Sequence, residues 1–212
     1  ENFLATQENP APSRDFILQP NEELIKKYSS KAKLLNLAFL KIFKGSEYVK
    51  KMIGKEYHPL FLTLTTGTTN QPVSFFYTNN DLENLKTAGF RLLEVFGQYE
   101  YGKGVNLFPY APHLAFWQTV FSAIAHGEFL LSTGGGKVMD TDKNIEAIAK
   151  IEPGIIIGEP SFVYHVFRSA EEQKRNYKFI NKVILGANRV PLGFKQKIAS
   201  LLKNMNAENV SV

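Results

Sequence analysis

Five small polar residues stand together between two apolar segments: Thr65, Thr66, Gly67, Thr68 and Thr69. The backbone N–H groups of such a loop, together with four hydroxyl groups, can donate hydrogen bonds to a phosphate without any fixed positive charge. The loop is not of the Walker type, because no Gly-Lys-Ser/Thr sequence follows it and no helix begins there. From composition alone, a phosphate-binding loop and a polar hairpin turn are equal alternatives.

Two further segments carry residues that bind ligands in other proteins. Three glycines, 134–136, precede Lys137 between an expected strand and an expected helix, where anions can bind. The Gly-x-Gly-x-x-Gly spacing is lacking, so a tight turn is the favoured interpretation. His113 precedes an apolar helix, and packing or capping is slightly favoured for it over a binding role. The other histidines show no metal-ligand spacing with each other or with nearby carboxylates.

The elements that must position these residues follow from apolar periodicity and from turn residues. We expect strands at 60–65, 73–77, 105–108, 128–131, 154–157 and 182–185. We expect helices at 78–96, 112–125, 140–151, 160–173 and 191–204. Thr78 is the expected N-cap of the first of these helices, with Asp81 reaching back to it. Strands that alternate with helices predict right-handed crossovers, an α/β fold and a largely parallel sheet, whose ligands bind at the carboxyl ends of the strands.

The N-terminal segment, 1–56, differs in character from the α/β portion, 57–212. Residues 1–20 read as an arm, and residues 21–55 contain nine lysines and three glutamates, a local balance of +6 against +5 for the whole chain. The apolar residues of this stretch have helical spacing, which predicts two short basic amphipathic helices. A solvated lysine face over a buried stripe is favoured over a surface for an anionic membrane or nucleic acid.

The composition limits the class of protein. With 212 residues, 44% hydrophobic and 13% aromatic, the chain is expected to be globular. It has no cysteine, which excludes disulfides and cysteine-based metal sites. The longest apolar stretch, near 114–125, is too short and too polar to span a membrane. We therefore expect a soluble, cytoplasmic protein with no integral membrane segment, whose N-terminus was processed or cut because it begins with Glu1.

Three stretches resemble one enzyme family. The segment LTTGTTNQPVSFFYTNNDL, from Leu64 to Leu82, resembles the phosphate loop of the adenylate-forming (AMP-binding) enzymes. Tyr77-Thr78 and Asp81-Leu82 make it most similar to the phenylacetate–coenzyme A ligase branch. Glu159–Val166 and Leu185–Pro191 resemble the Pro-Ser-aromatic and Gly-Ala/Gly-Glu segments of that branch. The resemblance covers the region from Pro59 to Val212, the N-terminal part of such an enzyme.

The resemblance implies a reaction and its participants. A carboxylate attacks the α-phosphorus of ATP to give an acyl-adenylate, and coenzyme A then takes the acyl group, with Mg²⁺ assisting. The partners would be a small carboxylate and coenzyme A, with no nucleic acid, and a homodimer is left open. The implied phosphate-binding residues are Thr65, Thr66, Gly67, Thr68, Thr69 and Asn70. The implied adenine and acyl-pocket residues are Gly186, Ala187, Asn188 and His113.

The sequence also departs from the family pattern. Asn70 replaces the second glycine of the loop, no lysine follows closely, and Asn188 replaces the usual glutamate. The Tyr-Gly-x-Ser/Thr-Glu motif and the lysine-bearing C-terminal domain do not occur before Val212. We expect the N-terminal part of an acid–thiol ligase, inactive by itself, whose carboxylate the sequence does not identify. The alternative is a non-catalytic domain of the same fold that binds a nucleotide, an acyl-CoA or a protein partner.

Overall fold

The computed structural model describes residues 22–64, 74–97, 102–110 and 112–212. The chain divides into two compact units, Glu1–Glu83 and Asn84–Val212, and each is described here by itself. The phosphate-loop residues 65–70 belong to the first unit by position, but they lie outside the described residues.

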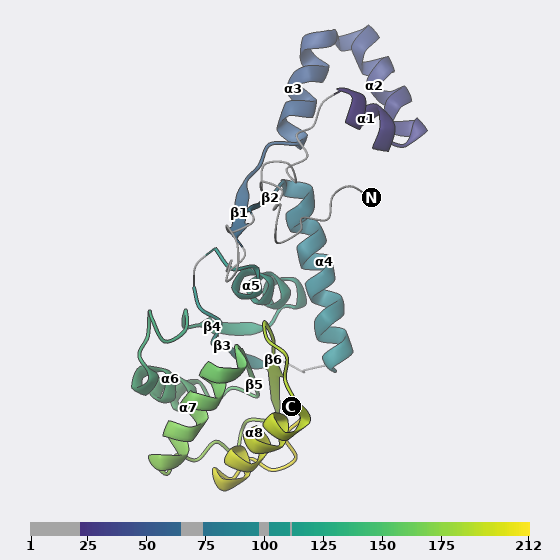
Figure 1. Cartoon of the computed structure of the whole chain (residues 1–212). Coiled ribbons are helices and arrows are strands. Elements are labelled where there is room, and N and C mark those ends of the chain that lie inside the picture. Colours follow the sequence, from purple (N-terminus) through teal and green to yellow (C-terminus); the bar gives the residue numbers. More distant parts are fainter. Residues whose placement is uncertain (1–21, 65–73, 98–101, 111) are drawn as a thin grey trace, which may run out of the picture. The chain divides into compact units, whose positions relative to one another are not determined.

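The first unit begins with three helices where two were expected (Figure 1). They are α1 (Glu22–Tyr28), α2 (Lys31–Lys44) and α3 (Ser46–Glu56). Ser30 caps α2, since its side chain accepts a hydrogen bond from the backbone N–H of Lys33. Gly45, with a φ of 85°, separates α2 from α3 in a conformation that other residues rarely adopt. Although α2 is rich in apolar residues, none of them is buried.

An antiparallel hairpin follows, as predicted. Strands β1 (Phe61–Leu64) and β2 (Ser74–Tyr77) pair Phe61 with Tyr77 and Leu64 with Ser74. The helix α4 (Asn79–Phe96) then starts at the predicted cap. The Thr78 N–H donates to Asp81 Oδ2 over 2.8 Å, and the Asp81 N–H approaches Thr78 Oγ1 at 3.4 Å. These reciprocal contacts pair two of the backbone N–H groups that a helix N-terminus leaves unpaired.

The second unit is built on a four-stranded parallel sheet, which confirms the predicted α/β fold. Its strands lie in the order β4-β3-β5-β6. Their bounds are β3 (Lys103–Asn106), β4 (Phe129–Ser132), β5 (Ile155–Gly158) and β6 (Lys182–Leu185). Every pairing between neighbouring strands is parallel. Beyond β6, Ser211 makes a single parallel bridge to Lys182.

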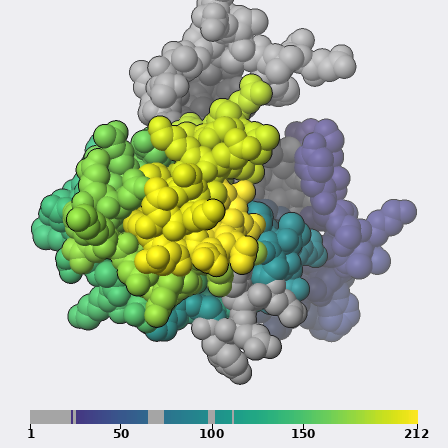
Figure 2. Space-filling view, turned by 90° about the horizontal axis from the view of Figure 1, so that it is seen from below, coloured from purple at the N-terminus to yellow at the C-terminus, as the bar shows by residue number. Residues whose placement is uncertain are grey.

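Three helices cover one face of this sheet: α6 (Thr141–Ile151), α7 (Pro160–Glu172) and α8 (Leu192–Asn204). Neighbours α7 and α8 lie side by side, green and yellow in Figure 2. Their apolar side chains and those of alternate strand residues, such as Val105, Ile156 and Val183, form the main core. We call this face of the sheet the closed face.

The opposite face is covered by α5 (Leu114–His126) and the C-terminal part of α4. Phe116 of α5 packs there with Ile155 and Ile157. Gly89 of α4 allows a close approach to α5, because a Cβ at this position would lie 2.3 Å from Ser122 Oγ. We call this the α5 face.

Element bounds agree with the sequence predictions to within about two residues. The largest difference concerns β3, predicted at 105–108 and observed at Lys103–Asn106. Leu107 and Phe108 are both buried, as their apolar character indicates. They lie in the core just beyond the end of β3 and are not part of the strand. Pro191 is the N-cap of α8 and not its first helical residue.

Candidate functional site at the carboxyl edge of the sheet

The topology marks one edge of the sheet as the candidate site. The connection from β3 through α5 covers one face, whereas the connection from β5 through α7 covers the other, and β3 and β5 are neighbours. The loops after these two strands therefore diverge to opposite faces, which makes the end of the β3–β5 pair a topological switch point. In open α/β sheets, ligands bind in the crevice at such a switch point.

The loop after β3 is held by a buried side chain, Asn106. Its Nδ2 donates to the Phe116 carbonyl over 3.3 Å and to Ser132 Oγ over 3.2 Å. Its Oδ1 accepts from the Phe108 N–H over 3.0 Å. One amide thus joins the ends of β3 and β4 to the first turn of α5. The sequence analysis did not identify Asn106, whose only signal was an asparagine within an apolar strand.

The loop after β4 forms the predicted tight turn. Gly134 and Gly135 have φ values of 77° and 72°. A Cβ on Gly135 would lie 2.9 Å from Pro109 Cα, so the turn packs against the loop after β3. The Gly134 carbonyl accepts from the Tyr110 N–H over 2.9 Å, which fixes the two loops to each other. Gly134 and Gly135 therefore have a structural reason for their presence, as the favoured interpretation of a tight turn expects, and anion binding at this turn stays the untested alternative.

The loop after β5 brings a carboxylate, Glu159, to the edge. Its side chain caps α7 through the Phe162 N–H, at 2.9 Å from Oε2. Its Oε1 accepts from Ser161 Oγ over 3.1 Å and from Asn188 Nδ2 over 2.8 Å. Partial burial by itself would raise the pKa of Glu159, but these hydrogen bonds outweigh it and lower that pKa below its ordinary value. The carboxylate is therefore charged at neutral pH.

The loop after β6 contains the three residues predicted at the adenine or acyl pocket. The Gly186 N–H donates to the Gly158 carbonyl over 3.2 Å, and a Cβ on Gly186 would lie 3.3 Å from Phe108 Cζ. Ala187 has a φ of 75°, which an alanine seldom adopts. Asn188 is exposed and bound to Glu159. Gly186, Ala187 and Asn188 thus lie at the same edge as Glu159.

His113, the fourth predicted pocket residue, occupies the N-cap position of α5. It is half-buried, and its side chain makes no capping hydrogen bond, so it does not cap the helix. Aromatic rings follow in the same helix: Phe116 and Trp117 lie edge to face with centroids 5.3 Å apart, and Tyr110 contacts both. The edge therefore combines one charged carboxylate with aromatic surface, and the role of His113 stays a prediction.

The described parts of the chain contain neither a cluster of metal-ligating side chains nor a membrane-spanning helix. No three His, Asp or Glu side chains gather there into a group that could hold a metal ion. None of the helices in the described ranges is long and apolar enough to cross a membrane.

Comparison with solved structures identifies the fold. No protein-family model matches the chain, and no curated protein sequence matches it. An open-conformation structure of 2-hydroxyisobutyryl-CoA ligase, in complex with 2-HIB-AMP and CoA, is similar with a TM-score of 0.63 and 16% identity, covering 70% of this chain and 32% of the ligase. The fold is therefore that of a part of the adenylate-forming acyl-CoA ligases.

Two further ligases show the same relation. A long-chain-fatty-acid-CoA ligase from Archaeoglobus fulgidus has a TM-score of 0.59 at 18% identity, covering 74% of this chain and 30% of its own. An o-succinylbenzoate CoA synthetase from Bacillus subtilis has a TM-score of 0.52 at 17% identity, covering 68% and 28%. The chain thus spans about a third of the length of these enzymes.

Proposed function

We propose that the chain is part of an ATP-dependent acid–thiol ligase, which converts a carboxylate to an acyl-adenylate and then transfers the acyl group to coenzyme A. The observation that carries the proposal is the topological switch point between β3 and β5, in a fold shared with acyl-CoA ligases. Resemblance at Tyr77-Thr78, at Asp81-Leu82 and in the segment Glu159–Val166 favours the phenylacetate–coenzyme A ligase branch.

Each group of residues has a proposed role. The loop of Thr65, Thr66, Gly67, Thr68, Thr69 and Asn70 donates N–H and O–H groups to the phosphates of ATP. The backbone of Gly186 and Ala187 lies beside the adenine or the acyl group, and His113 lies at the acyl side. The Asp and Glu side chains of the described ranges form no cluster that could hold a metal ion. We therefore assign Mg²⁺ to none of them.

The pair of Glu159 and Asn188 accounts for one departure from the family pattern. A glutamate at position 188 would place a second carboxylate where Asn188 now donates to Glu159 over 2.8 Å. Two carboxylates at that distance repel each other unless one is protonated. We infer that Glu159 supplies the negative charge at this edge and that Asn188 orients it. The pairing of one carboxylate with one amide at this edge favours a functioning site over the non-catalytic alternative.

The experiment uses the complete protein that contains this chain and measures carboxylate-dependent exchange between ATP and pyrophosphate. Thr68→Val removes a phosphate donor and is expected to lower exchange by about 10²-fold. Thr141→Val, at the start of α6, is the matched control and should leave exchange unchanged. No exchange in the wild-type protein, with nucleotide binding retained, would favour the non-catalytic domain instead.

The proposed pairing of Glu159 with Asn188 has its own test. Asn188→Glu alone is expected to lower exchange about tenfold, because it opposes Glu159. Adding Glu159→Gln restores one carboxylate and one amide and should recover most of the loss. Equal loss in the single and double variants would contradict the proposed pairing.

A further inference from the structure

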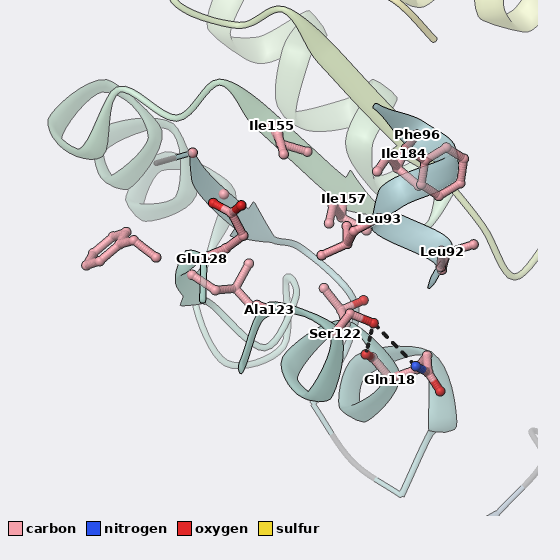
Figure 3. Close-up of a pocket in the computed structure, with 15 residues that line it drawn as sticks. Leu92, Leu93, Phe96, Gln118, Ser122, Ala123, Glu128, Ile155, Ile157 and Ile184 are labelled. Carbon is pink, nitrogen blue, oxygen red and sulfur yellow. Dashed lines mark hydrogen bonds between the residues drawn. The ribbon is translucent and has the colours of Figure 1, made fainter. Parts of the chain in front are cut away.

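A second site lies on the α5 face, toward the amino ends of the strands. A pocket is enclosed by the C-terminal part of α4, by α5 and by the sheet (Figure 3). Its walls are mainly apolar and include Leu93, Ile155, Ile157 and Ile184. Its charged end is separate from the carboxyl edge, since Glu128 precedes β4 and lies five residues before Thr133, about 16 Å along a strand. Its apolar wall extends toward that edge at Ile157 and Ile184.

Small residues create the space. Gly104 of β3 and Ala123 of α5 both line the pocket and contribute little or no side chain. The cavity volume is about 50 Å³, roughly a third of the ~150 Å³ of an engineered cavity that holds benzene. Its lining residues Leu92 and Phe129 are 44% and 56% exposed, so the pocket opens to solvent beside them. By the same proportion the cavity holds about two heavy atoms, so the inner part of a short alkyl chain fits within it and the rest lies at the opening.

One charged group, Glu128, borders the mainly apolar pocket, whose other polar lining residues are Gln118, Thr119 and Ser122. Its side chain is only 9% exposed. Its Oε1 accepts a hydrogen bond from His126 Nδ1 over 2.8 Å. Its Oε2 is buried and has no hydrogen-bond partner within the described residues. A buried acceptor without a partner costs about 1–3 kcal/mol, and more when it is charged, so this oxygen calls for a donor.

The charges around Glu128 specify what kind of donor fits. His126 lies between Glu128 and Glu94, whose Oε1 is 3.2 Å from His126 Nε2, so even a fully protonated imidazole leaves at least one negative charge of the three groups unbalanced. The side chain of Glu94 is 42% exposed to solvent, whereas that of Glu128 is 9% exposed. Lys103 and Lys182, on strands that border the pocket, donate to the carbonyls of Ile151 and Phe96. A cationic donor is therefore the complement of Glu128 Oε2.

We propose that this pocket binds a small primary alkylammonium ligand. The ammonium donates to Glu128 Oε2, and the short alkyl stem packs on Leu93, Ile155 and Ile157. A protonated amine supplies both the missing donor and the missing positive charge, and its stem replaces water against an apolar wall. Amine binding at this pocket requires neither ATP nor a carboxylate substrate, so it can be tested independently of the proposed ligase activity.

The test uses the 212-residue chain at pH 7 with n-propylamine as the probe and n-propanol as its uncharged counterpart. Ligand-observed NMR titration should show saturable amine binding in the millimolar range, since a ligand of four heavy atoms has little area to bury. Propanol should bind at least tenfold more weakly. Glu128→Gln, which keeps the shape and removes the charge, should weaken amine binding at least tenfold. The control Glu172→Gln, on the exposed side of α7, should leave it unchanged.

Three results would overturn the proposal: no saturable amine binding, equal binding of amine and alcohol, or unchanged amine binding in Glu128→Gln. Should Glu128→Gln fail to fold by circular dichroism, Ala123→Val replaces it. That variant narrows the pocket and leaves the carboxylate in place, so it should abolish amine binding, and retained binding would count equally against the site.

Discussion

The two faces of the parallel sheet are packed differently. On the closed face, the side chains of Ile148, Val163, Phe167 and Ile198 are fully buried, and the core is continuous from α6 to α8. On the α5 face, the buried apolar cluster is small and polar groups such as Asn106 and Ser122 are buried beside it. The same face borders the pocket with Glu128. Stability is therefore concentrated on one side of the sheet, and the pocket bordered by Glu128 lies on the other.

Truncation of one phenylalanine on the closed face should give the largest effect. Phe167→Ala removes a fully buried ring and is expected to lower the free energy of unfolding by about 3–5 kcal/mol. Phe129→Ala, at an exposed position bordering the α5-face pocket, should cost about 1 kcal/mol or less. Urea denaturation of both variants measures the difference. Equal losses would show that the two faces do not differ as described.

A methyl group at the crossing of α4 and α5 should have an intermediate effect. Gly89→Ala places a Cβ 2.3 Å from Ser122 Oγ and 2.7 Å from Ser122 Cα, so the helices must separate, at a cost of about 1–3 kcal/mol. Gly193→Ala in α8 meets no atom within 4 Å and should instead stabilise the protein by up to about 1 kcal/mol. Thermal unfolding of the two variants should shift in opposite directions. A stabilising Gly89→Ala would mean that the crossing is looser than the structure shows.

The smallest expected effect depends on pH and concerns His126. Its hydrogen bond to Glu128, opposed by burial and assisted by Glu94, raises the pKa of His126 above its ordinary value near 6.5. A group with a raised pKa contributes stability that is complete below the unfolded pKa and is lost as pH rises through the folded pKa. We therefore expect the α5 face to lose about 1 kcal/mol or less from pH 6 to pH 8.5. Urea denaturation across this pH range should show the loss of stability in the wild type and not in His126→Gln. The same pH dependence of stability in both proteins would contradict this role of His126.

Local sequence signals predicted the elements well. The cap formed by Thr78 and Asp81 follows from residue types three positions apart, and β6 was predicted with its observed bounds because turn residues flank a short apolar run. The shift of β3 shows the limit of this reasoning. Apolar character reports burial, and Leu107 and Phe108 are buried without pairing in the sheet.

The candidate site was less predictable, because it depends on which strand ends lie next to each other. Glu159 and Asn188 are far apart in sequence and meet only because β5 and β6 are neighbours. Glu128 and His126 are separated by one residue, yet nothing in their spacing indicates that one carboxylate oxygen is buried and unpaired. The phosphate-loop residues Thr65–Asn70 were assigned by resemblance, lie outside the described residues and stay a prediction.

The strand order also has a consequence for how fast the protein folds. The central pair joins Gly104 of β3 to Ile155 of β5, so about fifty residues, including α5, β4 and α6, lie in the loop that this pairing closes. Contacts between residues so distant in sequence require a long loop to close, and the entropy of loop closure is lost before the contact stabilises the fold, which slows folding. The β1–β2 hairpin closes a far shorter loop. During refolding, the sheet that carries the candidate site should therefore be the late-forming part of the molecule.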